Sequence, residues 1–75
     1  MEVRLPKIMG RETDAVLTRW HAEDGARVQE GDLLYELEVP KITTSKTAPA
    51  TGVLHRKVEE GERVRYGQVL AVIEN

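Results

Sequence analysis

Short hydrophobic runs alternate with turn residues along the whole chain. The runs are rich in Val, Ile, Leu and Thr, and clusters of Gly, Asp, Glu and Pro separate them. Each run is too short for a typical helix and carries the branched side chains that suit a pleated, half-buried surface. The pattern predicts an all-β fold, a small sandwich or flattened barrel, with strands within Ala15 to Trp20, Leu33 to Leu37, Ile42 to Thr47, Gly52 to Val58 and Val69 to Ile73.

The run that begins at Leu33 has the alternation of a strand with two unlike faces. Leu33, Tyr35 and Leu37 fall on one face, while Glu36 and Glu38 place acid on the other. Such a period of two is typical of a strand with one buried side. Residues 69–73 are hydrophobic at every position instead. We therefore expect the last strand to be covered on both faces.

The chain also contains an internal repeat. Residues 25–38 align without a gap on residues 61–74, at an offset of 36, and six of the 14 pairs are identical. One supersecondary unit has therefore been used twice, and the two halves should pair their apolar faces around a pseudo-two-fold axis. Val28 and Val64 are equivalent in the two halves and are expected to behave alike. With the short strands, the repeat predicts two four-stranded sheets.

The stretch between the two halves predicts a tight hairpin. A strand that ends at Glu38 and another that begins at Ile42 leave Val39, Pro40 and Lys41 between them. Proline favours the second position of a type I turn and pushes the residue before it toward the β region. Both preferences place Lys41 at the hairpin tip, with its amine in solvent and its backbone held by a strand on either side.

Length and composition limit the possible classes of protein. The 75 residues, 40% hydrophobic and 32% charged, fit one small globular domain over 1–75. No cysteine is present, which excludes disulfides and a thiol nucleophile and fits a reducing compartment. The net charge of −2 is scattered, which argues against nucleic acid or an anionic membrane surface as the partner. No run approaches the roughly 18 apolar residues of a membrane span, so we expect a cytoplasmic or matrix-type domain.

Nothing in the chain has the pattern of a catalytic site. His21 and His55 are isolated, without His or Cys at metal-ligand spacing, so a zinc site is not expected. The glycines are spread singly among turns and form no phosphate-binding loop. The remaining candidate is Lys41 as an attachment point, because it lies at a proline-fixed tip in the centre of a duplicated domain. We therefore expect no enzyme activity from the chain alone.

The residues around Lys41 resemble the biotinyl/lipoyl carrier domain family, and within it the lipoyl domains of 2-oxo-acid dehydrogenase acyltransferases. That family carries a modified lysine in a hairpin, and the matching stretch here is Glu38-Val39-Pro40-Lys41-Ile42-Thr43. Glu38 falls at the family's glutamate and Lys41 at its modified lysine. The segment from Ala48 to Leu54 is similar to the family's Ala-Pro-x-Ser-Gly-x-Leu. The resemblance covers the whole chain.

The resemblance implies lipoate in amide linkage to Lys41, within a recognition hairpin that includes Glu38, Val39, Pro40 and Ile42. It implies a swinging arm that shuttles acyl groups and reducing equivalents between the active sites of a 2-oxo-acid dehydrogenase complex. The implied partners are a 2-oxo-acid decarboxylase, dihydrolipoamide dehydrogenase and a lipoyl-attaching enzyme. The loop of residues 8–14, expected near the hairpin, would help to choose the decarboxylase.

Departures from the family pattern leave two other hypotheses open. Pro40 stands where the family has an acidic residue, Ile42 where it has Ala or Val, and Met9-Gly10-Arg11 where lipoyl domains usually have Gly-Glu. The second hypothesis is a biotin carrier of a carboxylase, because biotin domains use a lysine in the same hairpin, although between two methionines. The third is an unmodified β-sandwich used for binding or assembly. Whether Lys41 is modified in the native source, and with which group, separates the three.

Overall fold

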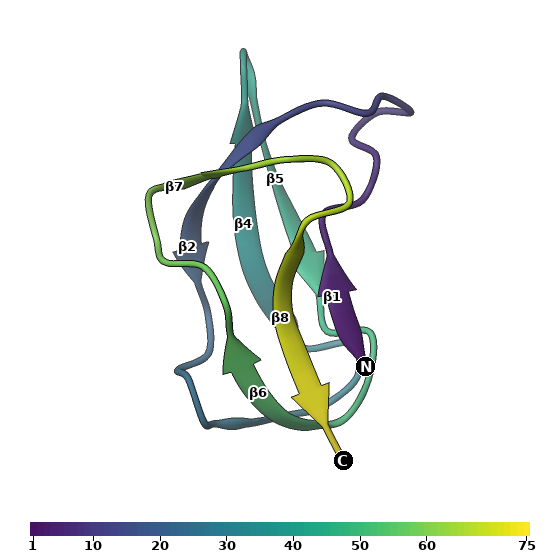
Figure 1. Cartoon of the computed structure of the whole chain (residues 1–75), viewed down its shortest axis with the longest axis vertical. Coiled ribbons are helices and arrows are strands. Elements are labelled where there is room, and N and C mark those ends of the chain that lie inside the picture. Colours follow the sequence, from purple (N-terminus) through teal and green to yellow (C-terminus); the bar gives the residue numbers. More distant parts are fainter.

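Eight short strands form two four-stranded antiparallel sheets (Figure 1). The computed structural model describes residues 1–75, and no helix that could span a membrane is present. One sheet has the order β1-β8-β6-β3 and the other the order β5-β4-β2-β7. The predicted all-β sandwich is therefore confirmed. Its strands are β1 (Glu2–Arg4), β2 (Ala15–Trp20), β3 (Arg27–Val28), β4 (Leu33–Val39), β5 (Ile42–Thr47), β6 (Gly52–Arg56), β7 (Glu62–Val64) and β8 (Val69–Glu74).

The two sheets are built on the same plan. When β1 is exchanged with β5, β8 with β4, β6 with β2 and β3 with β7, one strand order becomes the other. Backbone hydrogen bonds follow the same symmetry. The Gly25 amide donates to the Leu54 carbonyl and the Gly61 amide donates to the Leu17 carbonyl, both at 2.7 Å. The repeat in the sequence thus corresponds to the pseudo-two-fold symmetry that it predicts.

A β-bulge at Leu34 changes the faces predicted for β4. The pairing of β4 with β5 shifts by one residue between Leu33 and Tyr35. Leu34 and Tyr35 are therefore both buried, whereas Leu33 is 46% exposed. The prediction that Leu33 lies on the buried face is wrong, because a bulge adds one residue and reverses the alternation on its far side. At the equivalent place in β8, the pairing with β1 also shifts, and Leu70 and Ala71 are both buried.

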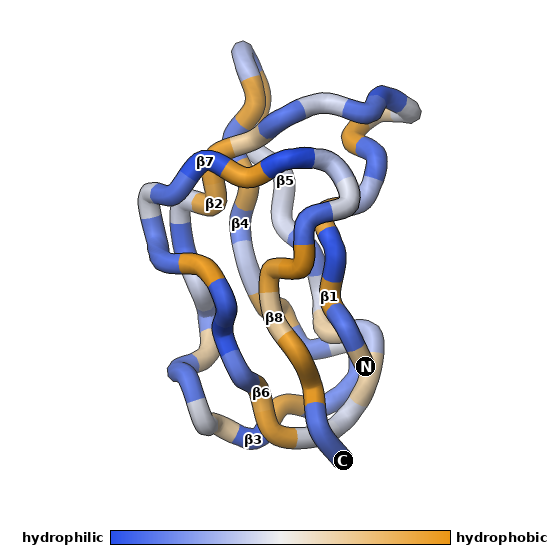
Figure 2. The backbone as a smooth tube through the Cα atoms, in the orientation of Figure 1, coloured by the Kyte–Doolittle hydropathy of each residue, from blue (hydrophilic) through white to orange (hydrophobic).

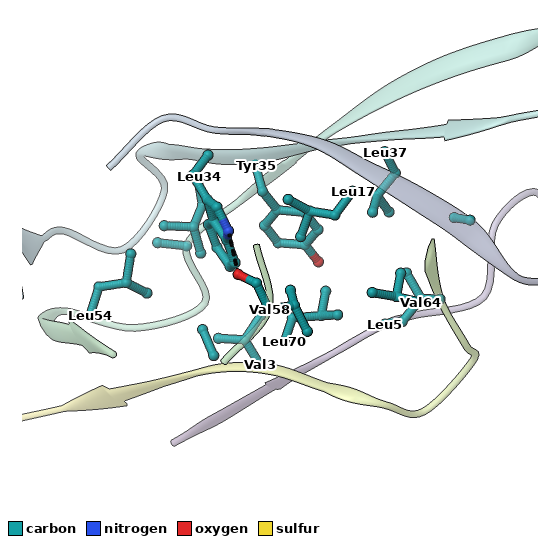
Figure 3. Close-up of a cluster of buried hydrophobic side chains, with 14 of the residues drawn as sticks. Val3, Leu5, Leu17, Leu34, Tyr35, Leu37, Leu54, Val58, Val64 and Leu70 are labelled. Atoms are coloured by element: carbon teal, nitrogen blue, oxygen red, sulfur yellow. Dashed lines mark hydrogen bonds between the residues drawn. The ribbon is translucent and has the colours of Figure 1, made fainter. Parts of the chain in front are cut away.

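One cluster of 18 buried hydrophobic residues fills the space between the sheets (Figure 3). Val28 and Val64 both belong to it, as the repeat predicts. Residues 69–73 of β8 are all buried or half-buried, which confirms the expectation from their unbroken hydrophobicity. Full burial of one Leu or Val contributes about 1.5–3 kcal/mol, so this cluster holds together a domain that has no disulfide.

The β4–β5 hairpin and the chain termini lie at opposite ends of the molecule (Figure 1). The amine of Met1 donates a hydrogen bond of 2.7 Å to the Ile73 carbonyl, which fixes the start of the chain beside β8. Because β5 corresponds to β1 and β4 to β8, the two termini occupy the place that the hairpin turn occupies in the other sheet. The hairpin tip therefore projects away from both termini.

Candidate functional site

Pro40 and Lys41 form the two-residue turn at the tip of the β4–β5 hairpin. Val39 pairs with Ile42 as the last step of the ladder, and the chain reverses between them. Pro40 fits the second position of the turn because its ring fixes φ near −65°. Lys41 has a φ of 76°. A positive φ at the third position is typical of a type II turn, so the predicted type I turn is wrong, although Lys41 does lie at the tip.

The backbone conformation of Lys41 is one that a side chain disfavours. Left-handed φ values cost a residue with a Cβ roughly 1–2 kcal/mol, and turns of this type normally place Gly or Asn at the position. Only one other non-glycine residue, Met9, has a positive φ in this structure. Strain of this kind is a reason to look for a function of the side chain. Lys41 is therefore a candidate functional residue.

The Lys41 side chain is exposed and none of the four ion pairs in the structure includes it. Val39, two residues before it, is only 9% exposed and belongs to the core cluster, so it anchors the hairpin, and it also lines the hollows on both sides of the turn. Ile42, on the other strand, is 37% exposed. The tip thus combines a rigid base with a free primary amine, which suits covalent attachment of a group through an amide bond.

One side of the hairpin carries charged groups. A hollow of about 430 Å³ there is lined by Asp14, Glu38 and Arg63 as well as by the turn residues. Arg63 Nε lies 3.6 Å from an Asp14 carboxylate oxygen, across the pairing of β2 with β7. Glu38 is exposed and lies three residues before Lys41. Its carboxylate is therefore accessible to any enzyme that acts on the lysine.

The other side of the hairpin borders the loop that joins β1 to β2. A hollow of about 530 Å³ is lined by four residues of this loop and by residues 39–42 of the hairpin. Ile8 and Arg11 exchange two backbone hydrogen bonds of 2.9 and 3.0 Å, which closes a tight turn in the loop. Figure 2 shows hydrophobic segments in both the loop and the hairpin, at the same end of the molecule. The expectation that residues 8–14 lie near the hairpin is confirmed.

The two histidines lie away from the hairpin tip, each beside a carboxylate. His21 Nε2 is 2.6 Å from a Glu36 oxygen, and His55 Nε2 is 2.6 Å from a Glu74 oxygen. The structure contains no group of three or more His, Cys, Asp or Glu side chains that could hold a metal ion. Burial raises the pKa of the Tyr35 hydroxyl to about 12. That residue belongs to the core and does not line either hollow beside Lys41.

Sequence reasoning did not place Met9 beside Lys41, although the two residues line the same hollow. Met9 is 80% exposed, more than any other large hydrophobic residue, and it has a φ of 52°. The sequence signals a turn there only through Gly10, since methionine is not a turn residue. Arg63 was also missed, because its place beside the hairpin depends on the pairing of β7 with β2.

The chain is similar to known proteins in both sequence and fold. A family model described as "Biotin-requiring enzyme", the biotin/lipoyl model, matches residues 1–73. The dihydrolipoyllysine-residue acetyltransferase component of the pyruvate dehydrogenase complex of Zymomonas mobilis is 35% identical over 75 residues. The dihydrolipoyllysine-residue succinyltransferase component of the 2-oxoglutarate dehydrogenase complex of Bacillus subtilis is 27% identical over 73 residues.

These two alignments cover 97% and 96% of this chain but only 17% and 18% of the relatives. The chain therefore spans less than a fifth of the length of the curated relatives it matches. Among solved structures, it is similar to the lipoyl domain of the 2-oxoglutarate dehydrogenase complex from Azotobacter vinelandii, with a TM-score of 0.81 and 24% identity. That match covers 100% of this chain and 96% of the other, and it establishes a shared fold.

Proposed function

The chain belongs to the biotin/lipoyl family, and we propose that it is a lipoyl carrier domain in which lipoate is joined by an amide bond to Lys41 Nζ. It is a carrier and not a catalyst by itself, since the matched region of its relatives is a small domain of a much longer acyltransferase component. The observation that carries the proposal is Lys41 itself, exposed and held at a positive φ on a rigid hairpin tip. Lipoate is favoured over biotin because these relatives are all dihydrolipoyllysine-residue acyltransferases.

The residues of the hairpin have separate tasks in this proposal. Lys41 supplies the amine, Pro40 sets the turn, and Val39 fixes the hairpin to the core. Glu38 and Ile42, both exposed beside the turn, would be contacted by the lipoyl-attaching enzyme. When bound, lipoate supplies a dithiolane for redox and acyl-transfer chemistry, which the chain lacks because it has no cysteine.

The proposed partners are components of a 2-oxo-acid dehydrogenase complex. A 2-oxo-acid decarboxylase would load the arm and dihydrolipoamide dehydrogenase would reoxidise it, so the domain has to visit several active sites. A tether raises the local concentration of Lys41 at each of them without any new contact. A cytoplasmic or matrix location, expected from the composition, stays part of this proposal.

The test is the intact mass of the chain purified from its native source, followed by peptide mapping around residue 41. We expect the mass of the chain to be raised by one lipoyl group, located on Lys41. The Lys41→Arg variant should lack this added mass. The Lys46→Arg variant, the matched change on β5 of the same hairpin, should keep it. A biotin increment, detected also with streptavidin, would contradict the lipoyl proposal and favour a carboxylase. A bare lysine in cells that lipoylate other proteins would contradict both.

A further inference from the structure

The backbone conformation and the solvent exposure of Met9 are both unfavourable for a methionine. Its φ of 52° and the φ of 75° at Gly10 make the two-residue turn between Ile8 and Arg11 a type I′ turn, in which Asn and Gly are the preferred residues. Its thioether side chain is also 80% exposed to solvent. Neither property helps the fold, because the neighbouring Ile8, 4% exposed, already anchors the loop in the core. The Met9 side chain is therefore a candidate contact for something outside the core.

Met9 and Lys41 line the same hollow. Besides the lysine, that hollow has only one charged residue, Arg11, and four of its eight lining residues are hydrophobic. Ile42, 37% exposed, adds apolar surface from the hairpin. The hollow on the other side of the hairpin does not include Met9 and contains three charged residues besides Lys41. A group attached at Lys41 can thus reach two surfaces, of which only the Met9 side is mainly apolar.

We propose that the arm on Lys41 rests in this hollow between visits to partner enzymes, with its hydrocarbon chain and dithiolane against Met9 and Ile42. The proposal rests on the lipoyl carrier function proposed above. It assigns Met9 as a positioning residue for the arm, and the docked state as one of two states that exchange in solution.

Three physical points support this occupant. The arm is covalently tied to a residue of the hollow, so contact needs no encounter between separate molecules. Its hydrocarbon chain and the exposed Met9 and Ile42 side chains all lose water-exposed apolar surface on contact. Methionine is unbranched and polarisable, and it adapts to flexible apolar groups and to sulfur better than a branched side chain does.

The first measurement uses the methionine methyl groups of the lipoylated 75-residue chain, compared by NMR with the unmodified chain. There are only two methionines, and Met1 lies at the opposite end of the molecule, so it is an internal control. Docking predicts a shifted Met9 methyl signal with nuclear Overhauser contacts to the methylenes of the arm, and an unchanged Met1 signal. An unshifted Met9 methyl without such contacts overturns the proposal.

The second measurement is the rate at which a bulky phosphine reduces the dithiolane. An arm that is docked two thirds of the time reacts about three-fold more slowly than a free arm. Met9→Asn removes the apolar contact but suits the positive φ, so it should fold and react about three-fold faster. Leu33→Gln is the control, because it also removes an exposed apolar side chain, at the far end of β4.

Equal rates in all three lipoylated chains overturn the docking and leave the proposed function intact. The intact mass of each chain is measured before the reduction, and it separates the two proposals. A chain from the native source that lacks the added mass of a lipoyl group overturns the proposed function. It also overturns the docking, which needs that arm. Ile42→Thr, on the other side of the hollow, should show a smaller acceleration in the same direction as Met9→Asn.

Discussion

The indole Nε1 of Trp20 donates a hydrogen bond of 3.0 Å to the backbone carbonyl of Val58, and so ties β2 of one sheet to the segment that follows β6 of the other (Figure 3). The guanidinium of Arg56 lies 5.5 Å above the same ring. The pseudo-symmetric equivalent of Trp20 is Arg56 itself, because Trp20 pairs with Tyr35 and Arg56 pairs with Ala71, the residue 36 positions later. The Arg56 Nη1 donates a longer hydrogen bond of 3.4 Å to the carbonyl of Ala22, the equivalent of Val58, so each half of the domain has such a link and the shorter one comes from the indole.

Trp20→Phe should lower the free energy of unfolding by about 1–3 kcal/mol. Phenylalanine has no N–H, so the buried Val58 carbonyl loses its indole donor, and an unpaired buried polar group costs that much. Urea denaturation followed by circular dichroism measures the difference. Tyr66→Phe is the control because Tyr66 is 43% exposed, and it should change the stability by less than about 0.5 kcal/mol. Equal stability of Trp20→Phe and the natural chain would contradict a structural role for this hydrogen bond.

Stability should fall at high pH because of Tyr35. Burial raises the pKa of this hydroxyl to about 12, whereas in the unfolded chain it is near 10.0. Above pH 10 the unfolded state loses the proton first, so unfolding is favoured progressively until the folded state also ionises near pH 12. The total loss is on the order of 2–3 kcal/mol, and none of it occurs below pH 9.

Tyr35→Phe should remove this pH dependence. The free energy of unfolding of Tyr35→Phe should be nearly constant from pH 9 to 11.5. Tyr66→Phe is the exposed control, and any change with pH that both variants show is not due to Tyr35. The measurement is urea denaturation at several pH values in this range. An equal decline in Tyr35→Phe and in the natural chain would show that groups other than Tyr35 cause the decline.

The hydrophobic runs and the repeat were sufficient to predict the five longer strands and the symmetry of the fold, because both are local or periodic properties of the sequence. The bulge at Leu34 was not predictable in this way. Leu33 and Leu34 are the same residue type, and the choice of which one is buried depends on the pairing of β4 with β5. Short strands such as β3 and β7 were missed as strands for the same reason, since only their partners hold them extended.

The candidate site was predictable as far as the hairpin tip, because Pro40 restricts the turn to a few conformations. The sequence did not reveal that the turn places Lys41 at a positive φ, because the statistics of proline turns favour type I for a lysine. It also gave no sign that Met9 lines the hollow with Lys41. The two residues are 32 positions apart, and their place beside one hollow depends on how the loop after β1 crosses the end of the sandwich.

Gly52→Ala should destabilise the domain by about 3 kcal/mol. A Cβ on Gly52 would lie 2.2 Å from the backbone oxygen of Glu74 in the paired strand β8, and backbone cannot move aside cheaply. Gly61→Ala is the matched control, since a Cβ there meets nothing within 4 Å. It should cost only the strain of a φ of +87°, about 1–2 kcal/mol. Denaturation that ranks the two variants in the opposite order would contradict the close approach of β6 to β8.

Lys41→Gly should stabilise the domain while it abolishes modification. Glycine adopts a φ of 76° without strain, which raises the free energy of unfolding by roughly 1–2 kcal/mol. Its greater conformational freedom in the unfolded chain lowers the free energy of unfolding by about 0.4–1 kcal/mol. The net increase in the free energy of unfolding is therefore up to about 1.6 kcal/mol. Lys41→Ala keeps a Cβ in the same conformation, so its stability should stay within about 0.5 kcal/mol of the natural chain.

Both Lys41 variants should lose the lipoyl increment, whereas Lys46→Gly should keep it and lose stability because glycine weakens a strand. Urea denaturation and intact mass on the same samples give both results. If Lys41→Gly is less stable than Lys41→Ala, the turn does not strain the lysine, and the argument from strain to function fails. A stabilising change that removes the modification would instead mean that the lysine is kept for its amine, because the turn alone favours glycine.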